Sequence, residues 1–134
     1  AERGFNIYQI SRNSDKLMAC QAELTEKFGV QVHSRAWDFN KSSYGLYELV
    51  SSVSEDIKGK DISILVNNVG TSMHGFFYLQ PIAKVNEVLT VNCLPITYLT
   101  RLVLPKMHQR KTPCAVINLS SVRCIVPFGG SAIY

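Results

Sequence analysis

The stretch "DISILVNNVG", residues 61–70, decides the fold. Its first half contains the apolar run 62–66, which is typical of a strand in the middle of a parallel sheet. The Asn-Asn-x-Gly that follows lets the backbone turn sharply, and Gly70 is expected to supply a permissive conformation. Asparagine side chains can tie neighbouring strands together while the backbone approaches a ribose. We therefore interpret Asn67 and Gly70 as part of a nucleotide-supporting turn at a strand end.

Segments with strand and helix patterns alternate on both sides of this stretch. Further strands are predicted at 5–10, 30–37 and 114–119, and helices at 14–29, 42–59 and 82–110. Ser14 or Asp15 is expected to cap the first helix, and Gly29 sits where a helix-ending glycine belongs. Pro95 predicts a kink or break in the third helix. The alternating order predicts an α/β fold with a parallel sheet, right-handed crossovers and helices on both faces.

Composition indicates a folded globular chain. The hydrophobic fraction is 46% and the charged fraction 18%, which argues against disorder. The net charge of +4 is dispersed and forms no basic stripe interleaved with aromatics, so no nucleic-acid partner is expected. Four basic residues gather at the predicted end of the third helix, where cations complement the helix dipole: Lys106, His108, Arg110 and Lys111. A phosphate or membrane contact is the alternative for this cluster.

Metal binding and membrane insertion have no sequence signal. The four cysteines form no C-x-x-C pair, and no histidines stand at zinc-finger spacing, so free thiols and no metal site are expected. We recognise neither a targeting segment nor an apolar run long enough to span a bilayer.

Ligands of parallel α/β sheets bind beyond the carboxyl ends of the strands. Ser11 and Arg12 follow the first strand, and the guanidinium of Arg12 fits the 2′-phosphate of NADP. The alternative is an exposed loop arginine. Asp38 follows the second strand and could accept a hydrogen bond from an adenine amino group, or serve as a turn residue or helix cap.

Three residues in the second half of the chain are candidates for catalysis. Ser121 follows the fourth strand, and a Pro- and Gly-containing loop joins it to Tyr134, thirteen residues later. A serine at a strand end and a tyrosine at the start of the next helix could converge on one carbonyl oxygen. Asn92 is polar within an apolar helical stretch, so it needs hydrogen-bond partners. The alternative is an asparagine that only satisfies helix packing.

Taken together, these motifs resemble the short-chain dehydrogenase/reductase family. The matches are "ISRN", "WDF", "DISILVNNVG", "VNC", "VINLSS" and the final tyrosine, and they run in family order across nearly the whole chain. "NNVG", "VNC" and "TRLVLPKM" are most similar to one branch, that of the very-long-chain 3-oxoacyl-CoA reductases and the related 17β-hydroxysteroid dehydrogenases. The resemblance implies one NADP-binding domain, of which residues 1–134 are a fragment.

The resemblance also implies an activity, NADPH-dependent reduction of a 3-oxoacyl-CoA or 17-ketosteroid carbonyl. Tyr134 would protonate the substrate oxygen, Ser121 would hold that oxygen, and Asn92 would support a water relay. Five residues would serve NADP(H): Ser11, Arg12, Asp38, Asn67 and Gly70. A homodimer through the long helix 82–110 and a location in the endoplasmic reticulum are implied too, with any membrane anchor in segments outside these residues.

Two family features do not occur among these residues. The glycine-rich pyrophosphate loop precedes the first strand found here, and the catalytic lysine comes four residues after the tyrosine. Cys124 also stands where the family usually has glycine. A catalytically inactive fragment or isoform, at most a dimer-interface module, is therefore the main alternative. A different Rossmann-like domain, such as a methyltransferase or flavodoxin-type module, would give Ser121 and Tyr134 no role.

The resemblance makes this a partial doubly wound sheet with four strands and three helices. In the order 3-2-1-4-5-6, the strands found here would be the second to the fifth, so the first, central strand and the last strands are missing. The strands then form two pairs with unpaired inner edges. About five lost ladder bonds at ~1 kcal/mol each rival a net stability of roughly 5–15 kcal/mol. We expect the isolated chain to be unstable, aggregation-prone or closed by a non-native pairing.

Overall fold

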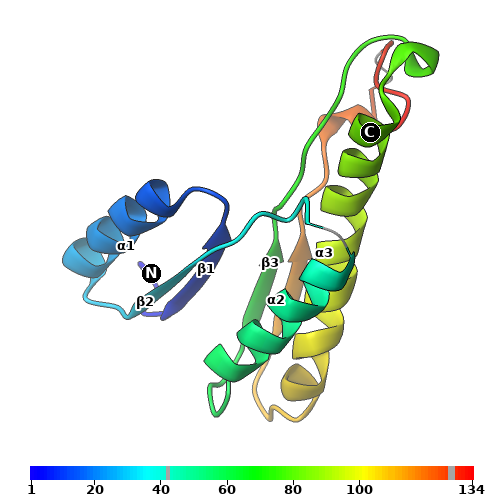
Figure 1. The fold of residues 1–134 in the computed structure, drawn as a ribbon. Coiled ribbons are helices and arrows are strands. Elements are labelled where there is room, and N and C mark those ends of the chain that lie inside the picture. The colour runs from blue at the N-terminus through cyan, green and yellow to red at the C-terminus, as the bar shows by residue number, and fades with distance from the viewer. Residues whose placement is uncertain (42, 127–128) are drawn as a thin grey trace. The chain divides into compact units, whose positions relative to one another are not determined.

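The structure is a computed structural model that describes residues 1–41, 43–126 and 129–134. It forms two compact units, Ala1–Phe39 and Asn40–Tyr134. The first contains β1 (Ile7–Ser11), α1 (Ser14–Phe28) and β2 (Val32–Ala36) (Figure 1). The second contains α2 (Ser43–Asp56), β3 (Ile64–Asn67), η1 (Phe77–Leu79), α3 (Ile82–His108), β4 (Ala115–Asn118) and η2 (Val122–Cys124). The predicted four strands and three helices are thus confirmed, while Ser42, the first residue of the expected second helix, lies outside the described residues.

In the first unit, α1 packs on a parallel pair of strands. The β1–β2 register runs from Ile7 opposite Val32 to Ser11 opposite Ala36. The Gln9 side chain on β1 links α1 to β2. Its Nε2 donates to the Leu17 carbonyl at 3.0 Å and to the Ser34 hydroxyl at 2.8 Å. Together with the buried side chains of Leu17 and Val32, these bonds fix the helix over the strands.

Helix α1 is capped one residue earlier than expected. The side chain of Asn13 accepts a hydrogen bond from the Lys16 N–H at 2.8 Å, so the predicted cap at Ser14 or Asp15 is wrong. Asn13 has the extended backbone that a cap requires, whereas both predicted residues already lie in the first turn. The predicted end is confirmed: Gly29 has φ 65°, a left-handed conformation that glycine adopts without strain.

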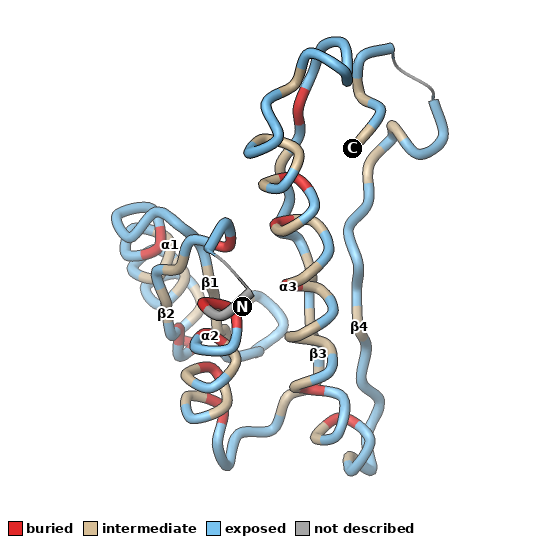
Figure 2. The backbone as a smooth tube through the Cα atoms, turned by 45° about the vertical axis from the view of Figure 1, so that its right-hand side comes forward, coloured by how far each residue is buried: buried red, intermediate tan, exposed pale blue. Residues whose placement is uncertain are grey.

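In the second unit, α3 packs on β3, and α2 packs on α3. Strands β3 and β4 are parallel, with Asn67 opposite Asn118 at their carboxyl ends. The apolar side of α2 packs on α3. The buried apolar side chains of the two helices and of the residue after α2 are Leu46, Leu49, Val53, Ile57, Val88, Val91, Pro95, Val103 and Met107. Buried positions recur along α3, whereas β4 is mostly exposed (Figure 2).

An aromatic pair joins the outer surfaces of α2 and α3. The rings of Tyr47 and Tyr98 are 5.6 Å apart between centroids. A side-chain hydrogen bond from Tyr47, together with its charge interaction, raises the pKa of Tyr98 above the usual value for tyrosine. Tyr98 is therefore neutral at physiological pH.

Helix α3 runs from Ile82 to His108 without a break, so a helix break at Pro95 is wrong. Pro95 removes one backbone N–H, but it is buried within the helix, which continues through this turn. Two residues further on, the Thr97 hydroxyl donates to the Cys93 carbonyl at 2.6 Å. The helix thus continues past Pro95, and a kink at this residue stays a prediction.

By length and composition alone, α3 could cross a membrane, which corrects the expectation that no such segment exists. Asn and Thr interrupt its apolar residues, yet from Val88 to Thr100 it carries no charge. A buried core helix would pass the same test, but only 17% of the qualifying window of α3 is buried.

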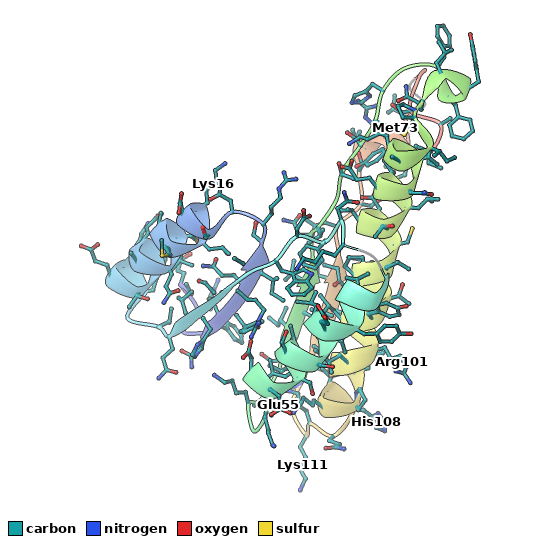
Figure 3. The ribbon with its side chains drawn as sticks, viewed as in Figure 1. Lys16, Glu55, Met73, Arg101, His108 and Lys111 are labelled. Carbon is teal, nitrogen blue, oxygen red and sulfur yellow. The ribbon has the colours of Figure 1, made fainter. Side chains whose placement is uncertain are left out.

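The basic cluster lies at the C-terminal end of α3, as predicted. His108 and Lys111 lie at or just beyond this end (Figure 3). Arg110 forms an ion pair with Asp61 and donates to the Thr112 hydroxyl at 2.6 Å. Arg110 therefore anchors the helix end to the segment that leads into β3.

The strands fall into the two expected pairs, β1–β2 and β3–β4, each a two-stranded sheet. Both pairings are parallel, and closure of the unpaired edges by a non-native pairing stays a prediction. One face of β3–β4 leaves large apolar side chains open, since Ile64, Val66 and Ile117 are 43%, 52% and 47% exposed. Low stability of the isolated chain stays a prediction.

Candidate functional site

The carboxyl end of the β3–β4 sheet is tied together by one asparagine. Asn67 Nδ2 donates to the Asn118 side-chain oxygen at 2.8 Å and to the Thr100 hydroxyl at 3.1 Å. These bonds join β3 to β4 and to α3 at the point where ligands of such sheets bind. The predicted tie between neighbouring strands is confirmed; the proposed ribose approach stays a prediction.

A second asparagine fixes the loop that follows. The Asn92 Oδ1 accepts from the Thr71 N–H at 2.8 Å, and its Nδ2 donates to the Thr71 carbonyl at 3.0 Å. This two-bond clamp holds the β3–α3 loop against α3. Asn92 thus has the partners that its apolar surroundings require, and its part in a water relay stays a prediction.

Gly70 differs from expectation. Its φ lies outside the left-handed region, so the predicted need for a permissive backbone is wrong. A Cβ at this position would meet Asn92 Oδ1 at 3.6 Å, an ordinary van der Waals contact. The clamp of Asn92 on Thr71, rather than an unusual glycine conformation, shapes the turn.

Ser121 and Tyr134 line one cavity of about 480 Å³, together with Gly70 and Asn92. Ser121 caps the short helix η2, and its hydroxyl oxygen accepts from the Arg123 N–H at 3.3 Å. A serine hydroxyl also has one hydrogen to donate, which this contact leaves available for an oxygen in the cavity. The tyrosine ring is 43% exposed, so solvent and small molecules reach it.

Four of the predicted site residues in the second unit therefore share one cavity: Gly70, Asn92, Ser121 and Tyr134. Asn67 does not line it and instead bonds to Asn118 and Thr100. Within the described ranges, no three His, Cys, Asp or Glu side chains gather as a metal site would require. Pro127 and Phe128, part of the loop between Ser121 and Tyr134, lie outside the described residues.

The remaining predicted residues belong to the first unit. Ser11 ends β1, and its carbonyl accepts from the Trp37 N–H at 2.9 Å. Because β1 and β2 are parallel, Arg12 and Asp38 follow the same end of this sheet, and both are exposed. Their expected contacts with a nucleotide stay predictions.

Three residues around the cavity were not predicted from the sequence. Thr71 is held through its backbone, which no side-chain pattern reveals. Arg123 and Ser131 line the cavity beside Tyr134. Arg123 was detectable, because it is the one charged residue between Lys111 and the final tyrosine.

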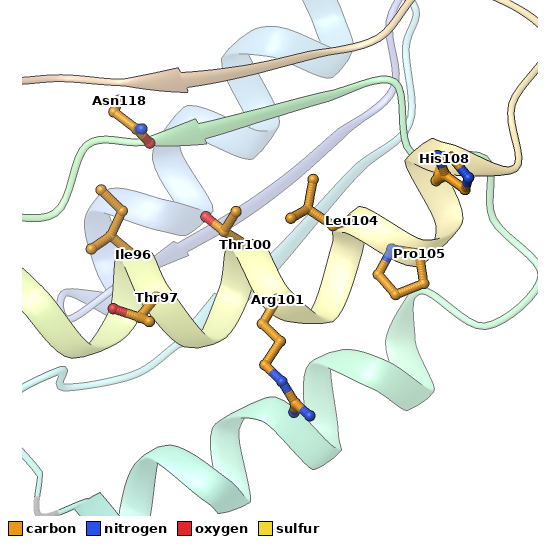
Figure 4. Close-up of a pocket in the computed structure, with 8 residues that line it drawn as sticks. All are labelled: Ile96, Thr97, Thr100, Arg101, Leu104, Pro105, His108 and Asn118. Carbon is orange, nitrogen blue, oxygen red and sulfur yellow. The ribbon is translucent and has the colours of Figure 1, made fainter.

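A larger hollow lies on the face of α3 beside β4 (Figure 4). Its volume is about 770 Å³, and its lining consists of Ile96, Thr97, Thr100, Arg101, Leu104, Pro105, His108 and Asn118. The lining pairs no hydroxyl with a tyrosine and contains none of the predicted catalytic residues. The predicted catalytic residues Asn92, Ser121 and Tyr134 line the smaller cavity instead.

Replacing Asn92 by alanine should destabilise the second unit by about 1–3 kcal/mol, since both Thr71 backbone groups lose their partner. Urea unfolding followed by circular dichroism measures this change. The matched control is Asn86→Ala, because Asn86 is an exposed asparagine six residues earlier on α3. Equal stability of the two variants would show that the clamp contributes nothing.

Parallel strands with helices packed against them, and polar residues at the carboxyl ends of the strands, are typical of a Rossmann-like nucleotide-binding fold. The family model described as short chain dehydrogenase matches residues 1–134, and the chain belongs to this family. The resemblance derived from the motifs is thereby confirmed.

Curated relatives point to the branch that the sequence suggested. The very-long-chain 3-oxoacyl-CoA reductase of Aspergillus clavatus is 39% identical over 95% of this chain and 36% of that relative. The protein of the same name from Bos taurus is 34% identical over 100% of this chain and 42% of that relative. The chain thus spans well under half the length of both.

Solved structures share the fold. A short-chain dehydrogenase from Sphingobium yanoikuyae in complex with NADPH has a TM-score of 0.84 and 27% identity, over 99% of this chain and 50% of that one. L-Sorbose reductase from Gluconobacter frateurii, complexed with NADPH and L-sorbose, has a TM-score of 0.82 and 29% identity, over 98% and 49%. The predicted α/β, partial Rossmann-like fold is confirmed.

Proposed function

We propose that this chain belongs to an NADPH-dependent ketoreductase that reduces a 3-oxoacyl-CoA carbonyl. The observation that carries the proposal is the shared cavity of Ser121, Tyr134 and Asn92. Support for the substrate comes from relatives named very-long-chain 3-oxoacyl-CoA reductase. A 17-ketosteroid is the second candidate substrate, on the motif resemblance alone. The endoplasmic reticulum is the proposed location, by the same resemblance.

In the proposed reaction, the Ser121 hydroxyl donates a hydrogen bond to the substrate carbonyl oxygen and fixes its position. The Tyr134 hydroxyl then transfers its proton to this oxygen as negative charge develops there. Asn92 keeps the β3–α3 loop in place beside them through its bonds to Thr71. The nicotinamide, when bound, supplies the hydride to the carbonyl carbon.

The first unit fits the adenosine end of such a cofactor. Arg12 is exposed directly after β1, and a guanidinium offers a planar set of donors to a 2′-phosphate. Asp38 follows the neighbouring strand and supplies an acceptor for the adenine amino group. Both groups are chemically suited to NADP, which favours NADPH over NADH.

The test measures oxidation of NADPH and of NADH by the purified protein with a 3-oxoacyl-CoA and with a 17-ketosteroid. We expect turnover with NADPH and the acyl-CoA. Arg12→Ala should raise the KM for NADPH about 10-fold or more and leave that for NADH unchanged, because a charge-assisted phosphate contact is lost. Lys16→Ala, an exposed cation on α1, is the control. Absence of turnover with either ketone would reject the proposal.

An inactive chain that only pairs with another subunit is the competing possibility. The exposed side of α3 offers Leu89 and Leu104, which are 45% and 48% exposed, as contacts for a second copy. Titration of the full chain with NADPH separates the two ideas. Saturable binding favours the reductase, whereas dimer formation without nucleotide binding favours the pairing module.

A further inference from the structure

A group of large apolar side chains is exposed at the N-terminal end of α3, on η1 and the residues that flank it. This group, the apolar tip, consists of Phe76, Phe77, Leu79 and Ile82, whose exposed fractions run from 51% to 75%. No residue from 76 to 82 is charged. Single exposed apolar side chains are ordinary on a protein surface, but four within seven positions indicate an interaction site.

Local hydrogen bonds hold the backbone of the apolar tip in place. The Leu79 N–H donates to the Phe76 carbonyl, and the Gln80 N–H to that of Phe77, both at 3.1 Å. The side chain of Gln80 closes the turn, because its Nε2 donates to the His74 carbonyl at 2.9 Å. Backbone groups that already have partners cost less free energy to move out of water. The apolar tip is therefore suited to enter an apolar phase.

The apolar tip adjoins the candidate site. The Gly75 N–H, just before the tip, donates to the Gly130 carbonyl at 3.0 Å, so this loop and the C-terminal segment lie side by side (Figure 1). The next residue, Ser131, lines the cavity together with Tyr134. A surface that receives the tip therefore lies close to the cavity.

The chain from β3 onward carries an excess of positive charge. Between residues 62 and 134 the one acidic side chain is Glu87, and Lys84 pairs with it at 2.8 Å. The basic side chains of this stretch are Lys84, Arg101, Lys106, Arg110, Lys111 and Arg123. Such an excess attracts the unit to an anionic surface, whereas a second copy of the chain would present the same positive charge. A bilayer with anionic lipids fits both the charge and the uncharged tip.

We propose that the apolar tip inserts into the surface of a lipid bilayer that contains anionic lipids. Its side chains enter the boundary between headgroups and acyl chains, as those of interfacial helices do. The proposal does not depend on the proposed function. If that function holds, docking brings the cavity to the phase in which long acyl chains dissolve.

The test is co-sedimentation of the full chain with vesicles of phosphatidylcholine, alone or mixed with phosphatidylserine. We expect saturable binding to both, tighter with phosphatidylserine. Phe76→Ser combined with Leu79→Ser should weaken binding to both compositions about 100-fold, since each large apolar side chain taken out of water contributes about 10-fold. The matched control is Met18→Ser combined with Leu104→Ser, which removes exposed apolar side chains outside the tip. It should bind as the unmodified chain does.

Equal binding by the tip variant and the unmodified chain overturns the proposal, because the basic end of α3 or insertion of this helix would then explain attachment. Self-association without lipid that the tip variant loses, measured by sedimentation velocity, also overturns it and assigns the tip to a second copy. No readout needs turnover, so failure to bind vesicles leaves the proposed reductase standing. A chain that binds vesicles but reduces no ketone contradicts the proposed function alone.

Discussion

Replacing Tyr134 by phenylalanine should lower kcat for the proposed ketone reduction by about 10²- to 10⁴-fold, the usual contribution of a positioned proton donor. The substitution removes a single oxygen from a ring that is 43% exposed, so packing changes little. Steady-state oxidation of NADPH measures the loss. KM should change far less than kcat, because the lost proton transfer acts in the transition state.

Tyr78→Phe is the matched control for this prediction. Tyr78 lies in η1, is 79% exposed and does not line the cavity. The same atom is removed there, and kcat should stay the same. If both variants retained full activity, another group would have to deliver the proton, and the assignment of Tyr134 would be wrong.

Leu46→Ala should give the largest loss of stability, about 2–5 kcal/mol in the free energy of unfolding. Leu46 on α2 has an exposed fraction of 0%, and its removal leaves a cavity between helices that pack on each other. Urea unfolding of the full chain, followed by circular dichroism, measures the change. A loss this large approaches the whole stability of a small domain, so the variant is expected to be partly unfolded at 37 °C.

The control for this prediction removes the same atoms from an exposed position. Leu89 on α3 is 45% exposed, and Leu89→Ala should change stability by no more than about 0.5 kcal/mol. Similar losses in the two variants would mean that the α2–α3 contact is not the core of the second unit.

The local sequence pattern predicted correctly those features that depend on residues close together in the chain. The apolar spacing of α2 placed Leu46 and Leu49 in the core, and the glycine after α1 marked its end. The helix start failed by one residue, because Asn13, Ser14 and Asp15 are all good caps and only the backbone conformation selects among them. A helix break at Pro95 does not occur, because α3 continues through this residue. A kink there stays a prediction.

The site residues also fall into two groups, those that the local sequence identifies and those that it does not. Ser121 was identified by its position after a strand, Tyr134 by its place at the start of the next predicted helix, and Asn92 as a polar residue in an apolar helical stretch. All three line one cavity. The partner of Asn92 is a backbone group of Thr71, which lies 21 residues earlier, and nothing in the local sequence marks it. The same holds for Arg123 and His74, which are 49 residues apart.

The sequence by itself determined the order of strands and helices, the family, and the polar residues at the strand ends, because short-range periodicity and motif spacing encode them. The turn shape beside Asn92 and the contact of Arg123 with His74 come from the tertiary structure alone. These depend on contacts between distant segments, and such contacts exist only once the chain has brought their backbones together.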